Sequence, residues 1–137
     1  MRNEKSIEIR SIEQKKIDNI LEVAFEMYIE EKNYNLIYKI QGGIEKVPLL
    51  CDAVVVSFIV YAVKYGLSFY SKYPITQKLY YNLTKHVIPQ LSLANKTENA
   101  MIHIDMPITD EIFDSSWVGT GISLGVDSFA TMHEYLE

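Results

Sequence analysis

Residues 116–128 (SWVGTGISLGVDS) hold the densest group of residues in this chain that could do chemistry. They predict a short apolar strand, a glycine-bearing loop and the start of a helix that continues through residues 129–136. Such a loop presents backbone N–H groups at the positive end of a helix, where phosphate oxygens can bind. We therefore interpret this segment as a candidate phosphate-binding loop.

Spacing excludes two familiar nucleotide-binding patterns. A Walker-type P-loop ends in Gly-Lys-Ser/Thr, and no lysine occurs in this segment. A dinucleotide fingerprint starting at Gly119 would need a third glycine where Leu124 stands. Residues 121–125 (GISLG) do fit the nucleophile elbow of serine hydrolases, with Asp127 and His133 downstream. These two side chains lie on the turn and helix directly after the serine, where neither could return as a triad partner. A serine-hydrolase fragment is kept as an alternative.

Residues 123–128 (SLGVDS) resemble the S-G-G-x-D-S loop of the PP-loop ATP pyrophosphatases. This superfamily includes asparagine synthetase, GMP synthetase, tRNA thiolation enzymes and deazaguanine synthases. In the family the loop holds the pyrophosphate of ATP while AMP is transferred to a substrate oxygen. The resemblance covers these residues and the strand and helix around them, and it departs at Leu124, where the family usually has glycine.

The resemblance assigns phosphate binding to Ser123, Gly125, Val126, Asp127 and Ser128. The two hydroxyls can donate to phosphate oxygens, and Gly125 lets the backbone come close. Asp127 can help to hold a Mg²⁺ ion or cap the following helix, and these roles do not exclude each other. ATP and Mg²⁺ are the cofactors that the resemblance implies, while the catalytic residues, the acceptor and the nucleophile stay unknown.

In the family this loop follows the first strand of a Rossmann-like parallel sheet. Only a few residues follow it here, so we expect a truncated chain whose later strands belong to a longer ligase- or amidotransferase-type parent. The chain alone is then expected to be inactive toward ATP. Residues 1–99 would form a helix-rich N-terminal domain, and residues 100–137 the start of the PP-loop domain.

The composition is that of a folded, soluble protein, with 48% hydrophobic and 23% charged residues in a chain of 137. That length suits about one domain. The lone Cys51 excludes an intramolecular disulfide, and the charged N-terminus does not read as a secretory signal, so we expect a cytoplasmic protein. The apolar run 49–63 is short for a bilayer and carries Asp52, so we expect no membrane span.

The elements of the first half are predicted from periodicity. Residues 6–10 alternate apolar and polar, which predicts a short strand. Residues 11–14 (SIEQ) match a capping box, and apolar residues then recur at helical spacing, so we predict a helix over 11–31. β-Forming residues over 34–40 are followed by a glycine pair and predict a strand.

The apolar run is best interpreted as a buried helix over 48–66. Pro48 suits a first turn, Asp52 the positive end and Gly66 the stop, although the valines between them also favour a strand.

A further helix is predicted from Thr76, with a kink or an end at Pro89. Residues 95–99 are polar and are the best candidate for a linker. Residues 101–106 alternate and predict a strand. On that strand His103 and Asp105 would share a side, as metal ligands could, but further ligands are not evident and a solvated strand face is expected.

Charge is distributed unevenly along the chain. The net charge is −5, yet residues 53–97 contain five lysines and no carboxylate. Tyrosines interleave with these lysines, a pattern that single-stranded nucleic-acid surfaces use. Because this stretch has no arginine and the protein is acidic, we expect a core margin or a protein interface and no nucleic-acid partner.

The sequence thus predicts an α/β chain. A helix-rich region with short strands is followed by the opening strand–loop–helix of a Rossmann-like PP-loop domain. The alternative is a non-catalytic helical interaction or dimerisation module. Strands over 101–106 and 117–122 would have open edges without their neighbours, so we also expect a homo-oligomer, most simply a symmetric dimer.

Overall fold

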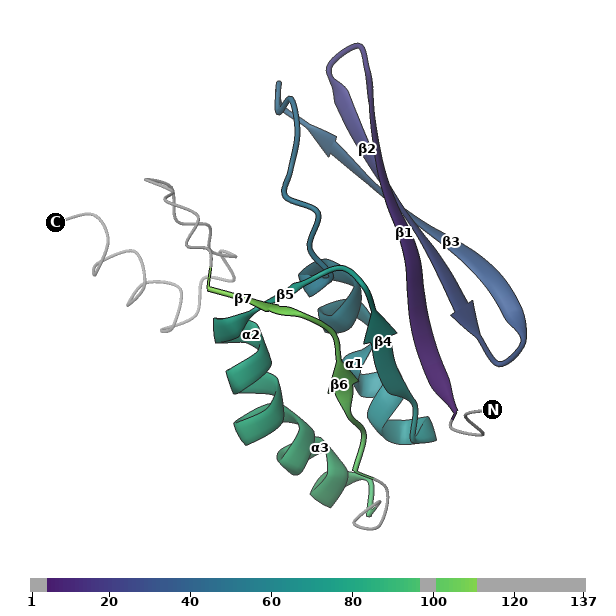
Figure 1. Cartoon of the computed structure of the whole chain (residues 1–137), viewed down its shortest axis with the longest axis vertical. Coiled ribbons are helices and arrows are strands. Elements are labelled where there is room, and N and C mark those ends of the chain that lie inside the picture. The colour runs from purple at the N-terminus through teal and green to yellow at the C-terminus, as the bar shows by residue number, and fades with distance from the viewer. Residues whose placement is uncertain (1–4, 97–100, 111–137) are drawn as a thin grey trace, which may run out of the picture.

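The computed structural model describes residues 5–96 and 101–110, which form a mixed α/β fold (Figure 1). Five strands make one sheet in the order β3-β2-β1-β4-β6, and β5 and β7 form a separate pair. The predicted α/β class is confirmed. The antiparallel strands are β1 (Ser6–Ile17), β2 (Ile20–Ile29) and β3 (Lys32–Gln41). Two strands extend this sheet by parallel pairing: β4 (Ser68–Ser71) beside β1, and β6 (Ile104–Asp105) beside β4. In the separate pair, β5 (Ile75–Thr76) is parallel to β7 (Ile108–Thr109).

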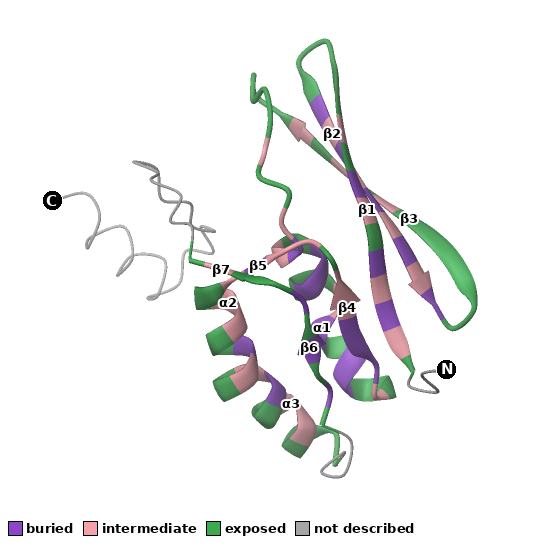
Figure 2. Cartoon of the chain, in the orientation of Figure 1, coloured by how far each residue is buried: buried purple, intermediate pink, exposed green. Residues whose placement is uncertain are grey.

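The predicted helix over residues 11–31 is wrong, because β1 and β2 occupy this segment. Buried residues alternate strictly with less buried ones along β2 (Figure 2), and the buried ones are Leu21, Val23, Phe25, Met27 and Ile29. An alternation with a period of two buries one face of a strand. The helical spacing from which the helix was predicted includes only some of these buried residues. Residues 6–41 therefore form long strands and not a helix-rich region with short strands.

Ser11 and Gln14, the two residues whose side chains would form the predicted capping box, make hydrogen bonds within the sheet region instead of at a helix start. Ser11 Oγ donates to Glu26 Oε2 on the neighbouring strand at 3.2 Å. The Gln14 amide forms two hydrogen bonds with the backbone of Val47: its nitrogen donates to the carbonyl at 2.7 Å, and its oxygen accepts the N–H at 2.8 Å. Gln14 thereby holds the segment that follows β3 against β1.

Two tight turns connect the antiparallel strands. Asp18, between β1 and β2, has a φ of 53°, and Glu30 and Glu31, between β2 and β3, have φ values of 46° and 67°. Two successive positive φ angles are typical of a type I′ turn, whose twist matches that of a hairpin. Glutamate carries a Cβ, so this left-handed conformation costs roughly 1–2 kcal/mol per residue.

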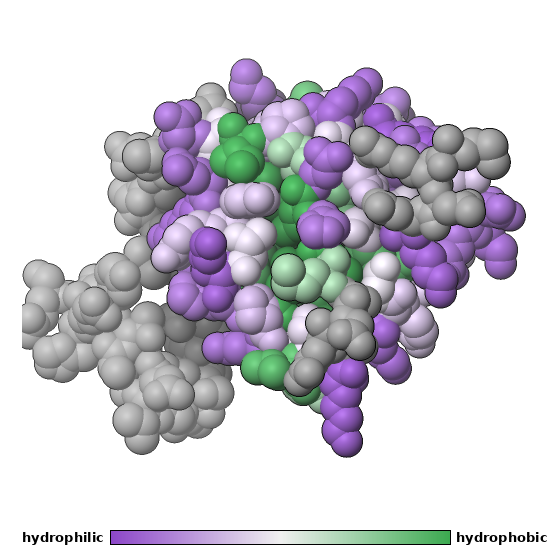
Figure 3. Space-filling model, turned by 60° about the horizontal axis from the view of Figure 1, so that its bottom comes forward, coloured by the Kyte–Doolittle hydropathy of each residue, from purple (hydrophilic) through white to green (hydrophobic). Residues whose placement is uncertain are grey.

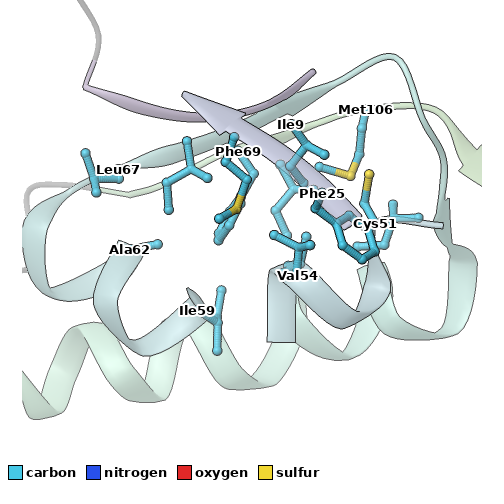
Figure 4. Close-up of a cluster of buried hydrophobic side chains, with 14 of the residues drawn as sticks. Ile9, Phe25, Cys51, Val54, Ile59, Ala62, Leu67, Phe69 and Met106 are labelled. Carbon is cyan, nitrogen blue, oxygen red and sulfur yellow. The ribbon is translucent and has the colours of Figure 1, made fainter. Parts of the chain in front are cut away.

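The helix predicted over 48–66 is present as α1 (Asp52–Tyr65), which ends at Gly66 with a φ of 67°. It begins later than predicted, so Pro48 precedes the helix and does not lie in its first turn. One stripe of α1 lies beneath the sheet and closes the core (Figure 4); it contains Val54, Val55, Ile59, Ala62 and Val63. The helix is the crossover that returns the chain from β3 to β4, so that β4 runs parallel to β1.

The helix predicted from Thr76 is also present. The Thr76 hydroxyl accepts the Leu79 N–H at 3.4 Å and caps α2 (Gln77–Asn82). A π-helical turn over Leu83–Val87 leads into α3 (Ile88–Ala94), which contains Pro89 and packs against α1. The irregularity predicted at the proline is therefore a widened turn just before it, not an end. A π-turn relieves the clash of a proline ring with the preceding carbonyl.

The strand predicted over 101–106 is shorter in the structure, where it is β6. Phe69 N–H donates to the His103 carbonyl at 2.8 Å, and the buried Ser68 Oγ accepts the His103 N–H at 3.0 Å. Residues on both sides of position 99 thus contribute to one sheet. In a space-filling view, hydrophobic side chains reach the surface between hydrophilic ones in the middle of one face (Figure 3).

Candidate functional site

The predicted phosphate-binding residues lie outside the described residues: Ser123, Gly125, Val126, Asp127 and Ser128. The same is true of the alternative serine-hydrolase elbow at 121–125 and of the strand predicted at 117–122. The predictions of ATP and Mg²⁺ as cofactors therefore stay predictions.

A polar cleft of about 360 Å³ lies where β4 ends beside β1. The last paired residues of the two parallel strands are Ile9 and Ser71. Ligands of open α/β sheets bind beyond the carboxyl ends of the parallel strands, so this is the candidate site among the described residues. Its lining residues are Glu8, Ile9, Arg10, Tyr70, Ser71, Lys72 and Asp105.

Three polar side chains of the cleft lie in a row across neighbouring strands. The register places Glu8 beside Tyr70, and Tyr70 beside Asp105. On its other side Glu8 is opposite Tyr28. Directly paired residues of a sheet point to the same face. Because the neighbouring Ile7 is buried in the core, this row belongs to the face opposite α1.

Arg10 is held above this row. The pairing of β1 with β2 shifts at this residue, which is the extra residue of a bulge. Its Nε and Nη2 donate to Glu8 Oε2 at 3.2 and 3.1 Å, and its guanidinium carbon lies 3.9 Å from the centre of the Tyr28 ring. A guanidinium fixed in this way presents its remaining donors in a defined direction, which suits a carboxylate or phosphate oxygen.

Ser71 builds the wall of the cleft. Its Oγ donates to the Ile9 carbonyl at 2.9 Å and accepts the Tyr73 N–H at 3.1 Å, so the hydroxyl is engaged in holding β4 to β1. Lys72 projects nearby, with Nζ 5.3 Å from the centre of the Tyr73 ring. The cleft thus combines two cations, two carboxylates and a tyrosine, a set suited to binding a small polar molecule.

Cys51 does not supply a nucleophile at neutral pH. The side chain is fully buried, and this burial raises the pKa of its thiol to about 11. Its Sγ donates a weak hydrogen bond to the Tyr73 carbonyl at 3.5 Å. A neutral, buried thiol is inert, since the thiolate is the reactive form.

His103 and Asp105 are both exposed, as a solvated strand face would be. Within residues 5–96 and 101–110, three or more His, Cys, Asp or Glu side chains do not gather in a group that could hold a metal ion. The helices of this described part also lack the length and apolarity that a membrane crossing requires.

The tyrosines of the lysine-rich segment come from different elements. Tyr61 and Tyr65 on α1 contact each other with tilted rings whose centres are 4.6 Å apart. Tyr70 lies on β4, and Tyr81 of α2 contacts His86 at 5.8 Å between ring centres. The interleaving seen in the sequence is therefore distributed over two helices and a strand.

Sequence reasoning did not identify Glu8, Arg10 and Ser71 as site residues. The alternation over 6–10 placed the first two on the polar side of a strand, and this was the available signal. Their approach to Lys72 and Asp105 depends on the α1 crossover and on the pairing of β4 with β6, which the spacing of residues does not reveal.

The comparisons with known proteins give no relative on which to base an assignment. None of the protein-family models matches the chain, and the searches of curated proteins and of solved structures give no match either.

Proposed function

We propose that the chain is part of an ATP-binding protein of the PP-loop type, which activates a carboxylate, amide or ring carbonyl as its adenylate and releases pyrophosphate. The observation that carries this proposal is the sequence of residues 123–128, with two hydroxyls, a glycine and an aspartate at the spacing of a pyrophosphate-binding loop. A Rossmann-like domain around the loop is part of the same proposal.

The fold of the described residues supports this proposal in one respect. β1, β4 and β6 run in parallel, and the chain reaches residue 110 from β7, which is also parallel to its neighbour β5. Parallel strands gather their carboxyl ends at one edge, where nucleotides and their co-substrates bind. The cleft at the end of β4 would then receive the small polar acceptor.

Titration calorimetry of the purified chain with inorganic pyrophosphate and Mg²⁺ tests the loop directly, because the contacts to this probe would come from the loop itself. Ser123→Ala and Asp127→Asn should each weaken binding by roughly ten- to a hundredfold, since a charge-assisted hydrogen bond contributes about 1.5–3 kcal/mol. Ser116→Ala, in the same segment but outside the pattern, is the matched control and should bind like the wild type.

Leu124→Gly sharpens the test. It restores the residue that the resembled family has at this position and should tighten pyrophosphate binding, because the backbone can then approach the phosphate more closely. Failure of the wild type to bind pyrophosphate at millimolar concentration, or equal binding by the wild type and both loop variants, would make the segment an ordinary strand–turn–helix. A role as a non-catalytic interaction module would then be the better interpretation of the protein.

A further inference from the structure

β3 is the outermost strand on one side of the sheet, and in the described part of the chain its outer edge has no neighbour (Figure 1). Ile29 and Lys32 close a two-residue turn, so they form a hydrogen-bonded pair, and such pairs alternate along a hairpin. The outward backbone groups therefore belong to alternate residues of the strand: Asn33, Asn35, Ile37, Lys39 and Gln41. The edge is ten residues long and contains neither proline nor a carboxylate.

Apolar side chains accompany this open edge. Ile37 is 52% exposed and is the one apolar residue among those outward-pairing positions, on the face of β3 opposite α1. On the other face Tyr34 is 46% exposed, and it lines a groove of about 270 Å³ together with Leu36 and Tyr61. Exposed aromatic and aliphatic residues next to unpaired backbone are typical of a strand that accepts a partner.

The helix layer is fixed beneath the same edge. The Tyr38 hydroxyl is 2.7 Å from Ser57 Oγ and donates to the Ala53 carbonyl at 3.2 Å. These contacts hold α1 against β3, so that Tyr61, 41% exposed, lies on the flank of the molecule that β3 forms. Strand and helix thus present one continuous surface.

We propose that β3 pairs with β3 of a second copy of this chain, antiparallel about a two-fold axis at Ile37, so that the two sheets become one. This register places Ile37 opposite Ile37 of the second copy and Asn35 opposite its Lys39. On the helix side it places Leu36 opposite Tyr38 and Tyr34 opposite Ile40. Every row then pairs apolar with apolar or polar with polar, which is how cross-strand pairs stabilise a sheet.

Neighbouring registers fit less well. A shift by two residues in either direction moves Ile37 opposite Asn35 or Lys39 and leaves the apolar residue of that face without an apolar partner. The two charges of β3, Lys32 and Lys39, do not face another lysine in the proposed register, and Lys39 already pairs with Glu22 at 3.1 Å. Self-complementarity of this kind favours a second copy over a foreign strand, since a two-fold contact uses the same patch twice.

The size of the surface also suits a dimer. A strand of ten residues is about 34 Å long, and a sheet with one helix layer is about 20 Å deep. Their product approaches the ~800 Å² per partner of a stable interface. This inference does not depend on the proposed nucleotide chemistry, and it uses a different part of the chain.

Cross-linking of Ile37→Cys tests the register. Hydrogen-bonded residues that lie directly opposite have Cα atoms about 5.5 Å apart, within the range of a disulfide. The native Cys51 is buried and does not compete. The matched control is Asn35→Cys, since position 35 would be displaced from its own copy by four residues, about 14 Å along the strand. Under mild oxidation Ile37→Cys should yield a covalent dimer, whereas Asn35→Cys should form little disulfide between the two copies.

Light scattering after size exclusion tests the association itself. The wild type at micromolar concentration should have twice the chain mass of 15.8 kDa. Ile37→Lys should be monomeric, because it brings two ammonium groups together on the axis. Leu93→Lys changes a still more exposed apolar residue on α3 and should leave the dimer intact. A monomeric wild type, equal cross-linking at positions 35 and 37, or a dimer that survives Ile37→Lys would each overturn the proposal. If the wild type is a monomer, the partner of the β3 edge would instead be a strand of another protein or residues 111–137.

Discussion

The two halves of the sheet are built in different ways. The antiparallel half, β1 to β3, has long strands joined by two-residue turns, and β2 alternates between buried and half-buried residues. In the parallel half, β4 has four residues and β6 has two, and the chain around β4 buries three residues in succession: Leu67, Ser68 and Phe69. The first half is held by local pairing and one buried face, whereas the second depends on crossovers and is buried on both faces only at Ser68 and Phe69.

β1 belongs to both halves, and the polar cleft lies where they meet. Up to Ile9 the strand pairs with β4, and beyond this residue it pairs only with β2. The bulge at Arg10 is at this change of partner, and bulges commonly redirect a side chain next to a functional site. The difference between the halves therefore accounts for the position of the cleft, and it predicts where substitutions should have the largest effects.

Phe69→Ala should break the parallel half. The ring is fully buried in the core, so its removal leaves a large cavity and should lower the free energy of unfolding by roughly 3–5 kcal/mol. Urea denaturation followed by circular dichroism measures this loss. Val60→Ala, on the exposed side of α1, is the control and should change stability by less than about 0.5 kcal/mol. Equal effects of the two variants would show that β4 does not organise the core.

Asp52→Ala tests the connection between the crossover helix and the segment after β4. Asp52 Oδ1 accepts the Thr76 N–H at 2.9 Å, and Oδ2 accepts the Thr76 hydroxyl at 2.5 Å. Loss of these charge-assisted bonds should lower the free energy of unfolding by roughly 2 kcal/mol. Asp52→Asn retains an acceptor for the N–H and should lose less. If both variants unfold at the urea concentration of the wild type, the start of α2 is held by packing alone.

The two halves were also unequally predictable from the sequence. α1 and the start of a helix near Thr76 were predicted correctly because Asp52, Gly66 and Thr76 are local signals that act within one turn of a helix. The helix predicted over 11–31 was wrong because the apolar residues of this segment fit both a helical and a strand periodicity. Long-range pairing with β3 decided between them, and a window of neighbouring residues does not contain that information.

The cleft was less predictable still. Glu8, Tyr70 and Asp105 are widely separated in the sequence, and the sheet register alone makes them neighbours. The loop at 123–128 gave the opposite situation, a strong local pattern that needed no fold to be recognised. Sequence reasoning therefore predicted a motif within one segment, which stays a prediction, and did not predict a candidate site assembled from several segments.

The pH dependence of stability probes the core at Cys51, the residue before α1. Burial raises the pKa of this thiol from 9.0 to about 11, and the charge of Asp52 adds to the effect. Between these values the unfolded chain has released the proton and the folded protein still holds it. Stability present below pH 9 should therefore fall as the pH rises toward 11, by at most roughly 1.4 kcal/mol per pH unit.

Urea midpoints of the wild type and Cys51→Ala, measured from pH 8 to 10.5, isolate this contribution. The variant begins less stable because of its cavity, but its stability should fall less steeply with pH. Parallel curves would mean that the thiol ionises as easily in the folded protein as in the unfolded chain.

The smallest expected effect is a gain in the antiparallel half. Glu30 and Glu31 both adopt positive φ in the turn between β2 and β3. The double substitution Glu30→Asn and Glu31→Gly supplies the pair that type I′ turns prefer, and it should raise the free energy of unfolding by about 1 kcal/mol. The gain should appear as a higher urea midpoint with an unchanged denaturant slope, because the buried surface stays the same. The matched control, Glu30→Gln with Glu31→Gln, removes the adjacent like charges but keeps both Cβ atoms. It should shift the midpoint by only a few tenths of a kcal/mol, since exposed charges interact weakly in water. An equal gain in this control would assign the strain of the turn to charge repulsion and not to its backbone conformation.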